Sequence, residues 1–256
     1  MSKTKLQVTI IISYFKKKSF FNQTIDSIKN QTFKNFEVIV VYDDKDKSEL
    51  SFVKKTLQKL PKYRLIINKK NIGVGLSRNK AIFLAKGEYI AFCDADDLWN
   101  KKKLKTQLSF MKKKKLNFSH TSYKVINYYG KMIGLFRIKK KISYKELLKS
   151  CDIATSSVVI NREILKKDFL FSNYKTKEDY CLWLKIIKKQ KELYGININL
   201  LSWRLSKNSL SDSLFQKLYD GFKVYYFNEN YNALLAMYLL IRLSLFALIK
   251  KFDMYR

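Results

Sequence analysis

Four short runs of β-branched and aromatic residues, separated by segments with helical periodicity, limit this chain to a small set of folds. Between the runs apolar side chains recur at three- and four-residue spacing, and Gly87 is expected to cap a helix over residues 76–85. Continuous apolar runs of this kind are typical of strands that are buried on both faces. The alternation predicts an α/β fold with a doubly wound, mainly parallel sheet flanked by helices. The four runs are residues 8–12, 36–42, 63–68 and 89–93.

The second half of the chain is less regular. From about Leu214 the pattern is helical, and residues 233–249 form an apolar stretch that only Arg242 and Ser244 interrupt. We therefore expect an α/β domain over residues 1–213 and a helical appendage over residues 214–256. The further elements expected before the appendage are strands at 118–123, 156–161 and 200–204 and a helix at 177–189.

Composition favours a folded protein in a reducing compartment. Hydrophobic residues make up 47% of the chain, with one proline and seven glycines, which excludes disordered and collagen-like polymers. The three cysteines, Cys93, Cys151 and Cys181, form no CxxC pair, so buried reduced thiols are expected. The first residues lack a signal-peptide pattern, and we therefore expect a cytoplasmic location.

The chain is strongly basic, with a formal net charge of +31 from 52 Lys and Arg against 21 Asp and Glu. Such an excess attracts nucleic acid, anionic lipid or phosphorylated ligands. Many lysines occur in short runs scattered over the whole chain, such as residues 101–103 and 112–115, which is typical of solvated faces. We expect weak attraction to a membrane surface, whereas a dedicated nucleic-acid site is unlikely.

Acidic side chains gather where two of the expected strands end. Asp43 and Asp44 close the second strand, and Asp94, Asp96 and Asp97 follow the fourth. Ligands of doubly wound sheets lie beyond the carboxyl ends of the strands. Carboxylates suit Mg²⁺ or Mn²⁺, which bind through one or two of them together with substrate phosphates. Turn chemistry at the first cluster and helix capping by Asp97 at the second remain simple alternatives.

A loop containing glycines lies between these two clusters. Asn71, Gly73 and Gly75 lead into a helix that carries Arg78. A guanidinium in this place can neutralise phosphate through two parallel hydrogen bonds. The loop by itself is unspecific, because such glycines also occur in ordinary turns.

The order and spacing of these motifs resemble the family 2 glycosyltransferases with the GT-A fold. The likeness is strongest to bacterial enzymes of cell-surface polysaccharide assembly, such as those of teichuronic acid synthesis, and it covers about residues 7–211. The segments that carry it are 8–12, 27–33, 36–41, Asp43-Asp44, 71–73, 77–79, 85–90, 94–99, Glu178-Asp179 with Trp183, Trp203-Arg204 and 208–211.

The resemblance implies an enzyme that moves a sugar from a nucleotide-diphosphate donor, with UDP expected, to a hydroxyl of a cell-surface glycan or a lipid-linked acceptor. It implies that Ser13 and Phe15 flank the donor base and that Asp44 accepts a hydrogen bond from it. Asn71 belongs to the donor-binding loop, and Arg78 would face the donor pyrophosphate.

The other implied roles concern the metal and the acceptor. Asp94 would reach the ribose or the metal shell, and Asp96 would ligate Mn²⁺ or Mg²⁺. Asp179 would be the general base in a single displacement that inverts the anomeric carbon, since a metal-bound diphosphate leaves without a protonating acid. Without the resemblance, an acid at a helix start is explained by the helix dipole. The residues implied on the acceptor side or in the late motifs are Glu178, Trp183 and Arg204.

The sequence departs from the family pattern at two places. Residues 13–16 stand where the family usually shows Pro-x-Tyr-Asn, so Phe15 keeps an aromatic ring but lacks the hydroxyl. Ser206 stands where a late-motif histidine is often found. The only histidine, His120, is expected to be structural.

Two other functions and two roles for the appendage remain open at the level of sequence. A sugar nucleotidyltransferase has a similar fold but usually a glycine-rich loop after the first strand, which residues 13–18 lack. A basic RNA- or membrane-binding module gives no reason for acids at two strand ends. Residues 233–249 are shorter than the ~20 that span a bilayer. They fit an interfacial helix on the inner membrane face, or a helix packed on the domain or a second copy.

Overall fold

The structure is a computed structural model, and it describes residues 6–166, 168–205 and 213–254, with side chains as far as residue 250. The elements in chain order are β1 (Val8–Tyr14), α1 (Lys18–Lys29), β2 (Phe36–Tyr42), α2 (Leu50–Leu57), β3 (Tyr63–Ile67), α3 (Val74–Leu84), β4 (Tyr89–Phe92), β5 (Leu98–Trp99), α4 (Lys103–Lys114), β6 (Phe118–Ile126), β7 (Met132–Phe136), β8 (Lys141–Ser143), α5 (Tyr144–Lys149), η1 (Thr155–Ser157), β9 (Val159–Asn161), η2 (Arg162–Ile164), α6 (Glu178–Gln190), β10 (Glu192–Arg204), α7 (Leu214–Lys223), the π-helical η4 (Val224–Asn228) and α8 (Ala233–Met254).

The strands form one mixed sheet in the order β3-β2-β1-β4-β9-β6-β10-β5, with β7 on β6 and β8 on β10. The first four strands are parallel, β9 is antiparallel to both of its neighbours, and β10 is parallel to β6. The parallel half agrees with the predicted strands to within about two residues. The carboxyl ends of β2, β1 and β4 therefore meet at one edge.

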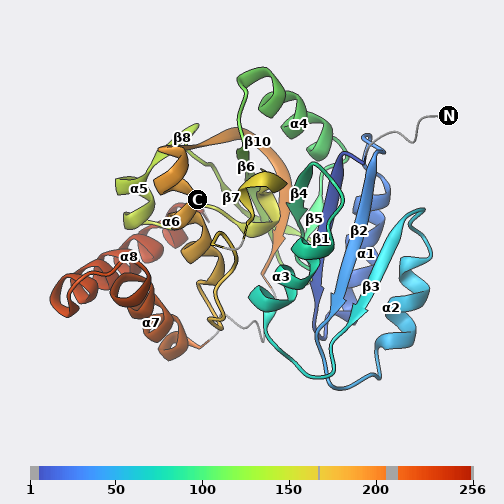
Figure 1. The fold of residues 1–256 in the computed structure, drawn as a ribbon, viewed down its shortest axis with the longest axis horizontal. Coiled ribbons are helices and arrows are strands. Elements are labelled where there is room, and N and C mark those ends of the chain that lie inside the picture. Colours follow the sequence, from blue (N-terminus) through green and yellow to red (C-terminus); the bar gives the residue numbers. More distant parts are fainter. Residues whose placement is uncertain (1–5, 167, 206–212, 255–256) are drawn as a thin grey trace.

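Helices cover both faces of this sheet, as Figure 1 shows. Side chains of α1, α2 and α4 form one hydrophobic core with the sheet, and those of α3, α5, α6 and α8 form the other. Ile10 and Ile12 of β1 enter the first core, whereas Ile11 enters the second. Successive side chains of a strand point to opposite faces, so a strand covered on both sides must be apolar throughout.

The tail packs against the α/β domain along one stripe. Ala236, Leu239 and Leu243 of α8 lie in the same core as Trp183 of α6. The helix α8 has 22 residues and continues past the apolar stretch 233–249 into Lys250 and Lys251. Its segment 233–250 is long and apolar enough to cross a membrane by length and composition, and 22% of that segment is buried inside the protein. The division at residue 213 stays a prediction.

Three local expectations are corrected by the structure. The helix before Gly87 ends with Ala85 as its cap, and Gly87 serves close packing, because a Cβ there would lie 2.4 Å from the Thr9 backbone nitrogen. The last strand runs from Glu192 and not from residue 200. The strand expected over 156–161 begins as the helical turn η1.

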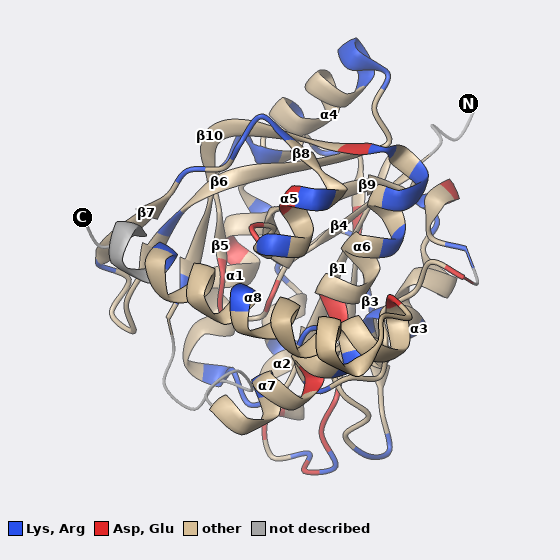
Figure 2. Ribbon diagram, turned by 90° about the vertical axis from the view of Figure 1, so that its left-hand side faces the viewer, with Lys and Arg blue, Asp and Glu red and all other residues tan. Residues whose placement is uncertain are grey.

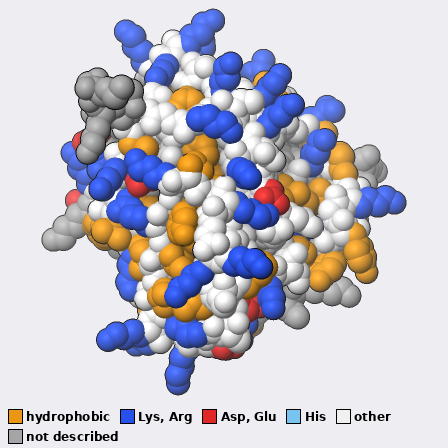
Figure 3. Space-filling view, turned by 90° about the vertical axis from the view of Figure 1, so that its right-hand side faces the viewer, with side chains coloured by type: hydrophobic (Ala, Val, Ile, Leu, Met, Phe, Trp, Pro, Cys, Tyr) orange, Lys and Arg blue, Asp and Glu red, His pale blue; other side chains and the backbone are white. Residues whose placement is uncertain are grey.

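The lysine runs lie on exposed or half-buried positions as the sequence indicated, with one exception among the residues that the structure describes. Lysines and arginines lie on most elements in Figure 2, and Figure 3 shows them spread over a whole face with few acids between them. Lys103 is the exception, because it is completely buried. Its Nζ donates to Gln107 Oε1 at 2.7 Å and lies 4.2 Å from the Trp99 ring centroid.

The three cysteines and the histidine agree with a structural role. Cys93, Cys151 and Cys181 are free thiols, two of them buried. His120 is completely buried, neither ring nitrogen has a hydrogen-bond partner, and burial lowers the pKa of the imidazole to about 3. A neutral imidazole packed in this way is a core residue.

Candidate active site

The acids predicted at strand ends lie at one edge of the sheet. Tyr14 of β1 pairs with Tyr42 of β2, and Ile11 of β1 pairs with Phe92 of β4. Asp43 and Asp44 follow β2, and Asp94 follows β4, so the end of β1 lies between the two clusters. Because β1 enters this edge as a parallel strand, the residues at and just after its end, Ser13 to Phe15, are placed among the acids.

Asp43 and Asp44 have different surroundings. Asp43 is buried and accepts hydrogen bonds from Asn68 Nδ2 at 2.8 Å and from the backbone N–H groups of Ile72 and Gly73, both at 2.9 Å. It therefore holds the loop that contains Gly73, whose φ of +92° suits glycine. Asp44 accepts from the backbone of Asp46 at 3.1 Å.

Residues expected at the donor base lie around this loop. Ser13 and Phe15 are half-buried, and the Ser13 hydroxyl points toward the Val74 carbonyl at 3.5 Å. Asn71 is exposed and donates from Nδ2 to the Asp43 carbonyl at 2.9 Å. The structure thus brings these residues together with Asp44 at the carboxyl ends of β1 and β2.

Arg78 of α3 bridges two carboxylates from distant parts of the chain. Its Nη2 donates to Asp94 Oδ1 at 2.6 Å and its Nη1 to Glu178 Oε1 at 2.7 Å. Burial opposes the guanidinium charge, but the carboxylates of Asp94 and Glu178 outweigh it and raise the pKa of Arg78. Arg78 is only 4% exposed. Its guanidinium therefore fixes α6 against the end of β4, and both of its terminal nitrogens are hydrogen-bonded to carboxylates.

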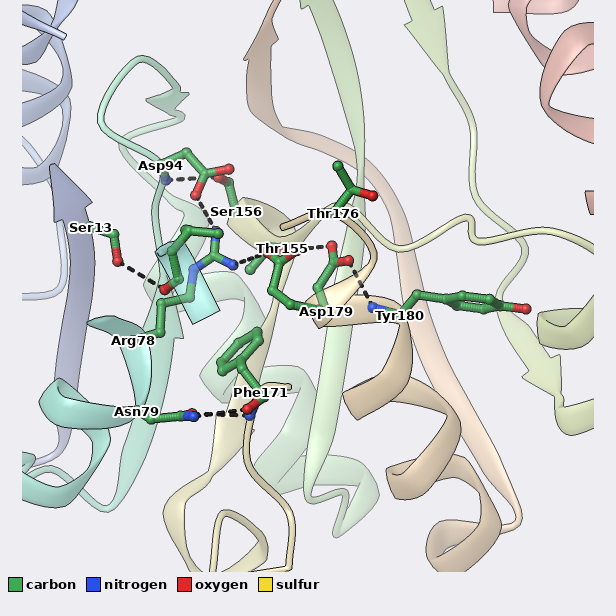
Figure 4. Close-up of polar contacts among 12 residues, drawn as sticks. Ser13, Arg78, Asn79, Asp94, Thr155, Ser156, Phe171, Thr176, Asp179 and Tyr180 are labelled. Carbon is green, nitrogen blue, oxygen red and sulfur yellow. Dashed lines mark hydrogen bonds and ion pairs between the residues drawn. The ribbon is translucent and has the colours of Figure 1, made fainter. Parts of the chain in front are cut away.

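Glu178 and Asp179 begin α6 and differ in their partners. Burial and the Asp179 carboxylate raise the pKa of Glu178 to about 7, against the opposing effect of Arg78. Asp179 is half-buried; its Oδ2 accepts from the Thr155 hydroxyl at 2.7 Å and its Oδ1 from the Tyr180 backbone N–H at 2.7 Å. Figure 4 shows the Asp179 carboxylate turned toward Thr155 and Arg78.

Two site residues, Thr155 and Ser156, were not predicted. Ser156 Oγ accepts from the Asp94 backbone N–H at 2.9 Å, while the adjacent Thr155 binds Asp179. One turn of η1 thus holds the acid after β4 and the acid on α6 side by side (Figure 4). Small hydroxyl residues give no periodic signal, and only the run Thr155-Ser156-Ser157 marks the place in the sequence.

Asp96 and Asp97 follow Asp94 in the sequence and have different partners. Asp96 pairs with Lys17 at 2.6 Å, a contact that the sequence did not indicate. Asp97 is buried and accepts from the Arg204 backbone N–H at 2.8 Å. Burial and the neighbouring Asp96 and Asp94 carboxylates raise the pKa of Asp97 well above its usual range. Asp97 does not cap α4, whose N-cap residue is Lys102.

The chain matches the model of one protein family, Glycosyl transferase family 2, over residues 9–169. It belongs to that family. Among its relatives is "UDP-Glc:alpha-D-GlcNAc-diphosphoundecaprenol beta-1,3-glucosyltransferase WfgD" of Escherichia coli, 34% identical over 82% of each chain. Another is TuaG of Bacillus subtilis (strain 168), named for teichuronic acid biosynthesis, 29% identical over 88% of this chain and 89% of its own.

Solved structures confirm the GT-A fold of this family 2 glycosyltransferase. TarS 1-349 of S. aureus in complex with UDP-GlcNAc superposes with a TM-score of 0.71 at 19% identity, over 91% of this chain and 70% of that one. The mannosyltransferase PcManGT of Pyrobaculum calidifontis in complex with GDP-Man and Mn²⁺ gives 0.69 at 15% identity, over 93% and 70%.

Two late-motif residues of the glycosyltransferase are structural. Trp183 is completely buried in contact with the rings of Phe92, Phe118 and Phe171. The expected contact of Trp183 with the acceptor is therefore wrong, and this side chain packs in the core. Arg204 is buried, and it donates from Nε to the Asp96 carbonyl at 2.9 Å and from Nη1 to the Tyr128 carbonyl at 2.9 Å. It fixes the Asp96 backbone. Ser206 and residues 208–211 lie outside the described residues.

The acids after β4 have the chemistry of a small divalent site. The Asp94 side chain is 36% exposed and that of Asp96 is 12% exposed, so oxygens of both reach the site edge. Within residues 6–166, 168–205 and 213–254 no group of three or more His, Cys, Asp and Glu side chains forms a metal cluster. A pair of carboxylates nevertheless fits Mg²⁺ or Mn²⁺, which complete their shells with water and substrate phosphate.

Proposed function

We propose that this glycosyltransferase moves a sugar from a UDP-sugar to a hydroxyl of a lipid-linked or cell-surface glycan with inversion of the anomeric carbon. The observation that carries the proposal is that Arg78 and η1 hold the end of β4 against the start of α6. Asp94 lies on the donor side, at the end of β4, and Asp179 lies on α6. A donor phosphate beside the first and an acceptor hydroxyl beside the second would share one reaction centre.

The donor half of the site is assigned to the ends of β1 and β2. Asp44 would accept a hydrogen bond from the base, the Phe15 ring would stack on it, and Ser13 and Asn71 would complete the rim. UDP is the nucleotide in the names of the relative WfgD and of the TarS complex. Strand ends beside a glycine-containing loop suit a nucleoside diphosphate, because the backbone of such a loop can approach the diphosphate closely.

Asp96, with Asp94, would hold Mn²⁺ or Mg²⁺. A bound divalent ion would neutralise the charge that develops on the leaving diphosphate. Lys17 neutralises Asp96 in this structure, and its ammonium lies at the same edge. Arg204 keeps the Asp96 backbone in place through the bond to its carbonyl. Arg78, which the sequence assigned to the pyrophosphate, would act through Asp94 by fixing its carboxylate.

Asp179 would be the general base. Its carboxylate accepts two hydrogen bonds, which orient it and leave lone pairs for a third partner. It would take the proton of the acceptor hydroxyl as that oxygen attacks the anomeric carbon from the face opposite the diphosphate, which inverts the configuration. Glu178 is bound by Arg78 and would position the start of α6 without touching the substrate.

The proposed acceptor places the enzyme at the inner face of the cell membrane. The relative WfgD is named for an acceptor on diphosphoundecaprenol, a lipid carrier. A cytoplasmic, peripheral enzyme could reach such an acceptor from the side on which nucleotide-sugars are made. The apolar tail and the net charge of +31 are consistent with this location.

Two substitutions test the assignment. Asp179→Asn should lower transfer on the order of 10²–10⁴-fold, because a general base contributes that much, while calorimetric affinity for UDP with Mn²⁺ stays unchanged. Asp96→Ala should weaken both. Asp26→Asn, a surface acid on α1, is the matched control and should change neither. Wild-type turnover by the Asp179→Asn protein would remove Asp179 as the base.

A further inference from the structure

The outer sides of α7 and α8 form an apolar surface that we call the α7–α8 face. It encloses a hollow of ≈ 500 Å³ whose lining is apolar apart from Ser244. The side chains are open to the outside, with Phe215 79%, Ile241 53% and Leu248 57% exposed. In Figure 2 most of α8 is drawn in the colour of uncharged residues. The residues that define the face are Phe215, Leu218, Met237, Ile241, Leu245 and Leu248.

The α7–α8 face is not explained by packing within the protein. Only a stripe of α8, including Ala236, Leu239 and Leu243, enters the core, and 22% of its apolar segment is buried. The buried residues of α7 are Asp220 and Gly221. A contiguous apolar surface of this kind on a folded protein marks a contact with a partner or a membrane.

The charged groups of the two helices, as far as residue 250, are half-buried cations and a buried acid, and Lys223 also lies 3.7 Å from Asp220. Between residues 214 and 250 the acids are Asp220 and Glu229, and both are buried at 1% and 9% exposure. Lys223 lies 4.0 Å from the Tyr174 ring centroid, and Arg242 lies 5.6 Å from that of Tyr238. An apolar strip bordered by cations and tyrosines matches the boundary between acyl chains and anionic headgroups.

We propose that the α7–α8 face lies flat in the headgroup region of a membrane that contains anionic phospholipid. The core stripe of α8 is held by the domain, so the helix can present its outer side to lipid without leaving the protein. A second copy of the chain is a poorer partner, because the same cations would meet one another. The purpose of this membrane contact rests on the proposed function, because the enzyme would bind a lipid-linked acceptor at the membrane surface.

Vesicle flotation tests the proposal. The protein should float with vesicles of phosphatidylcholine and phosphatidylglycerol in equal parts, should float less with phosphatidylcholine alone, and should lose binding in high salt. Phe215→Glu and Leu248→Glu should each weaken partitioning about tenfold to a hundredfold, as expected when one large apolar side chain is no longer buried. Phe83→Glu, at an equally exposed apolar position on α3, is the matched control and should float like the wild type.

Flotation of both variants at the wild-type level would overturn the proposal. So would a concentration-dependent dimer, seen by analytical ultracentrifugation, that Leu248→Glu dissociates. Transfer from UDP-sugar to a short soluble acceptor is measured on the same samples. An active enzyme that fails to float removes the membrane contact alone, whereas a floating protein without transferase activity removes the proposed function alone.

Discussion

At the scale of single residues, Arg78 is the most constrained side chain of the site. Arg78→Lys keeps the charge, but one ammonium cannot reach Asp94 and Glu178 in the way that two guanidinium nitrogens do. We expect the free energy of unfolding to fall by roughly 2 kcal/mol, because one buried carboxylate loses its partner, and transfer to fall at least tenfold. Urea unfolding and donor turnover measure the two effects.

The control for this substitution is Arg64→Lys. Arg64 also pairs with an acid, Glu37, but its side chain is 35% exposed. Glu37 is buried, but it also accepts hydrogen bonds from the Thr9 hydroxyl and the Lys86 backbone N–H. A lysine can keep the single contact that Arg64 makes with Glu37, so a change below about 1 kcal/mol is expected. If both substitutions lowered the free energy of unfolding equally, the two ion pairs of Arg78 would not be the reason for its effect.

The raised pKa of Glu178 predicts that the stability of the protein depends on pH. Its pKa is raised from 4.5 to about 7, so between these values the folded protein binds a proton that the unfolded chain has released. The free energy of unfolding should therefore fall as the pH rises through this window, by on the order of 1–3 kcal/mol. Glu178→Gln has no group to titrate there. The wild type minus variant difference, from urea unfolding at about pH 5 and pH 7.5, should decrease with pH; a constant difference would contradict the prediction.

Sequence reasoning found some site residues because their position follows from the fold. Asp44 and Asp94 follow β2 and β4, the parallel strands on either side of β1, so their meeting at one edge needed only the strand pattern. The partners of Arg78 could not be found in this way, because Glu178 lies 100 positions away and is brought near by tertiary packing. The burial of Lys103 was hidden inside a lysine run for the same reason.

At the scale of elements, α7 is tied to the segment that precedes α6 by one carboxylate. Asp220 Oδ2 accepts from the Thr176 backbone N–H at 2.9 Å and from its hydroxyl at 3.0 Å, two residues before Glu178. Asp220→Asn places an amide N–H₂ among these donors and should cost about 1–3 kcal/mol of stability. We expect kcat to fall severalfold with the KM for donor unchanged, because only the acceptor half is loosened.

Asp26→Asn serves as the control for this prediction as well. Asp26 pairs with Lys59 on the surface, and its side chain is 43% exposed, so stability should change by less than about 1 kcal/mol. If Asp220→Asn also raised the KM for donor, the effect would be a general loosening of the fold and not a displacement of α6.

The predictability of elements depended on how each is buried. The strands β1, β2 and β4 were predicted closely because both of their faces are covered, which makes the apolar run continuous, whereas β3 is a half-buried edge strand. Only the end of β10 was predicted, since its pairing with β6 shifts register between Ile196 and Leu201 and the alternation is lost there. Gly87 was misassigned because a glycine after a helix usually ends it, whereas here it admits the backbone of β1.

At the scale of the whole molecule, the net charge of +31 acts on stability as well as on binding. Like charges spread over a compact surface repel one another, and salt screens this repulsion over about 10 Å at 0.1 M. The unfolding midpoint should therefore rise by several degrees when salt is increased from about 0.02 M to 0.2 M. The buried contacts of Arg78 and Asp220 are screened much less, so they should not reverse this direction.

A triple variant separates net charge from other effects of salt. Lys112, Lys113 and Lys114 are exposed in the last turn of α4, at a distance in sequence from every proposed site residue. Replacing all three by Gln lowers the net charge from +31 to +28, so the rise of the midpoint with salt should become smaller. An unfolding midpoint that falls with added salt in both proteins would mean that attraction within surface ion pairs outweighs the repulsion between like charges. The net charge would then matter for ligand binding and not for stability.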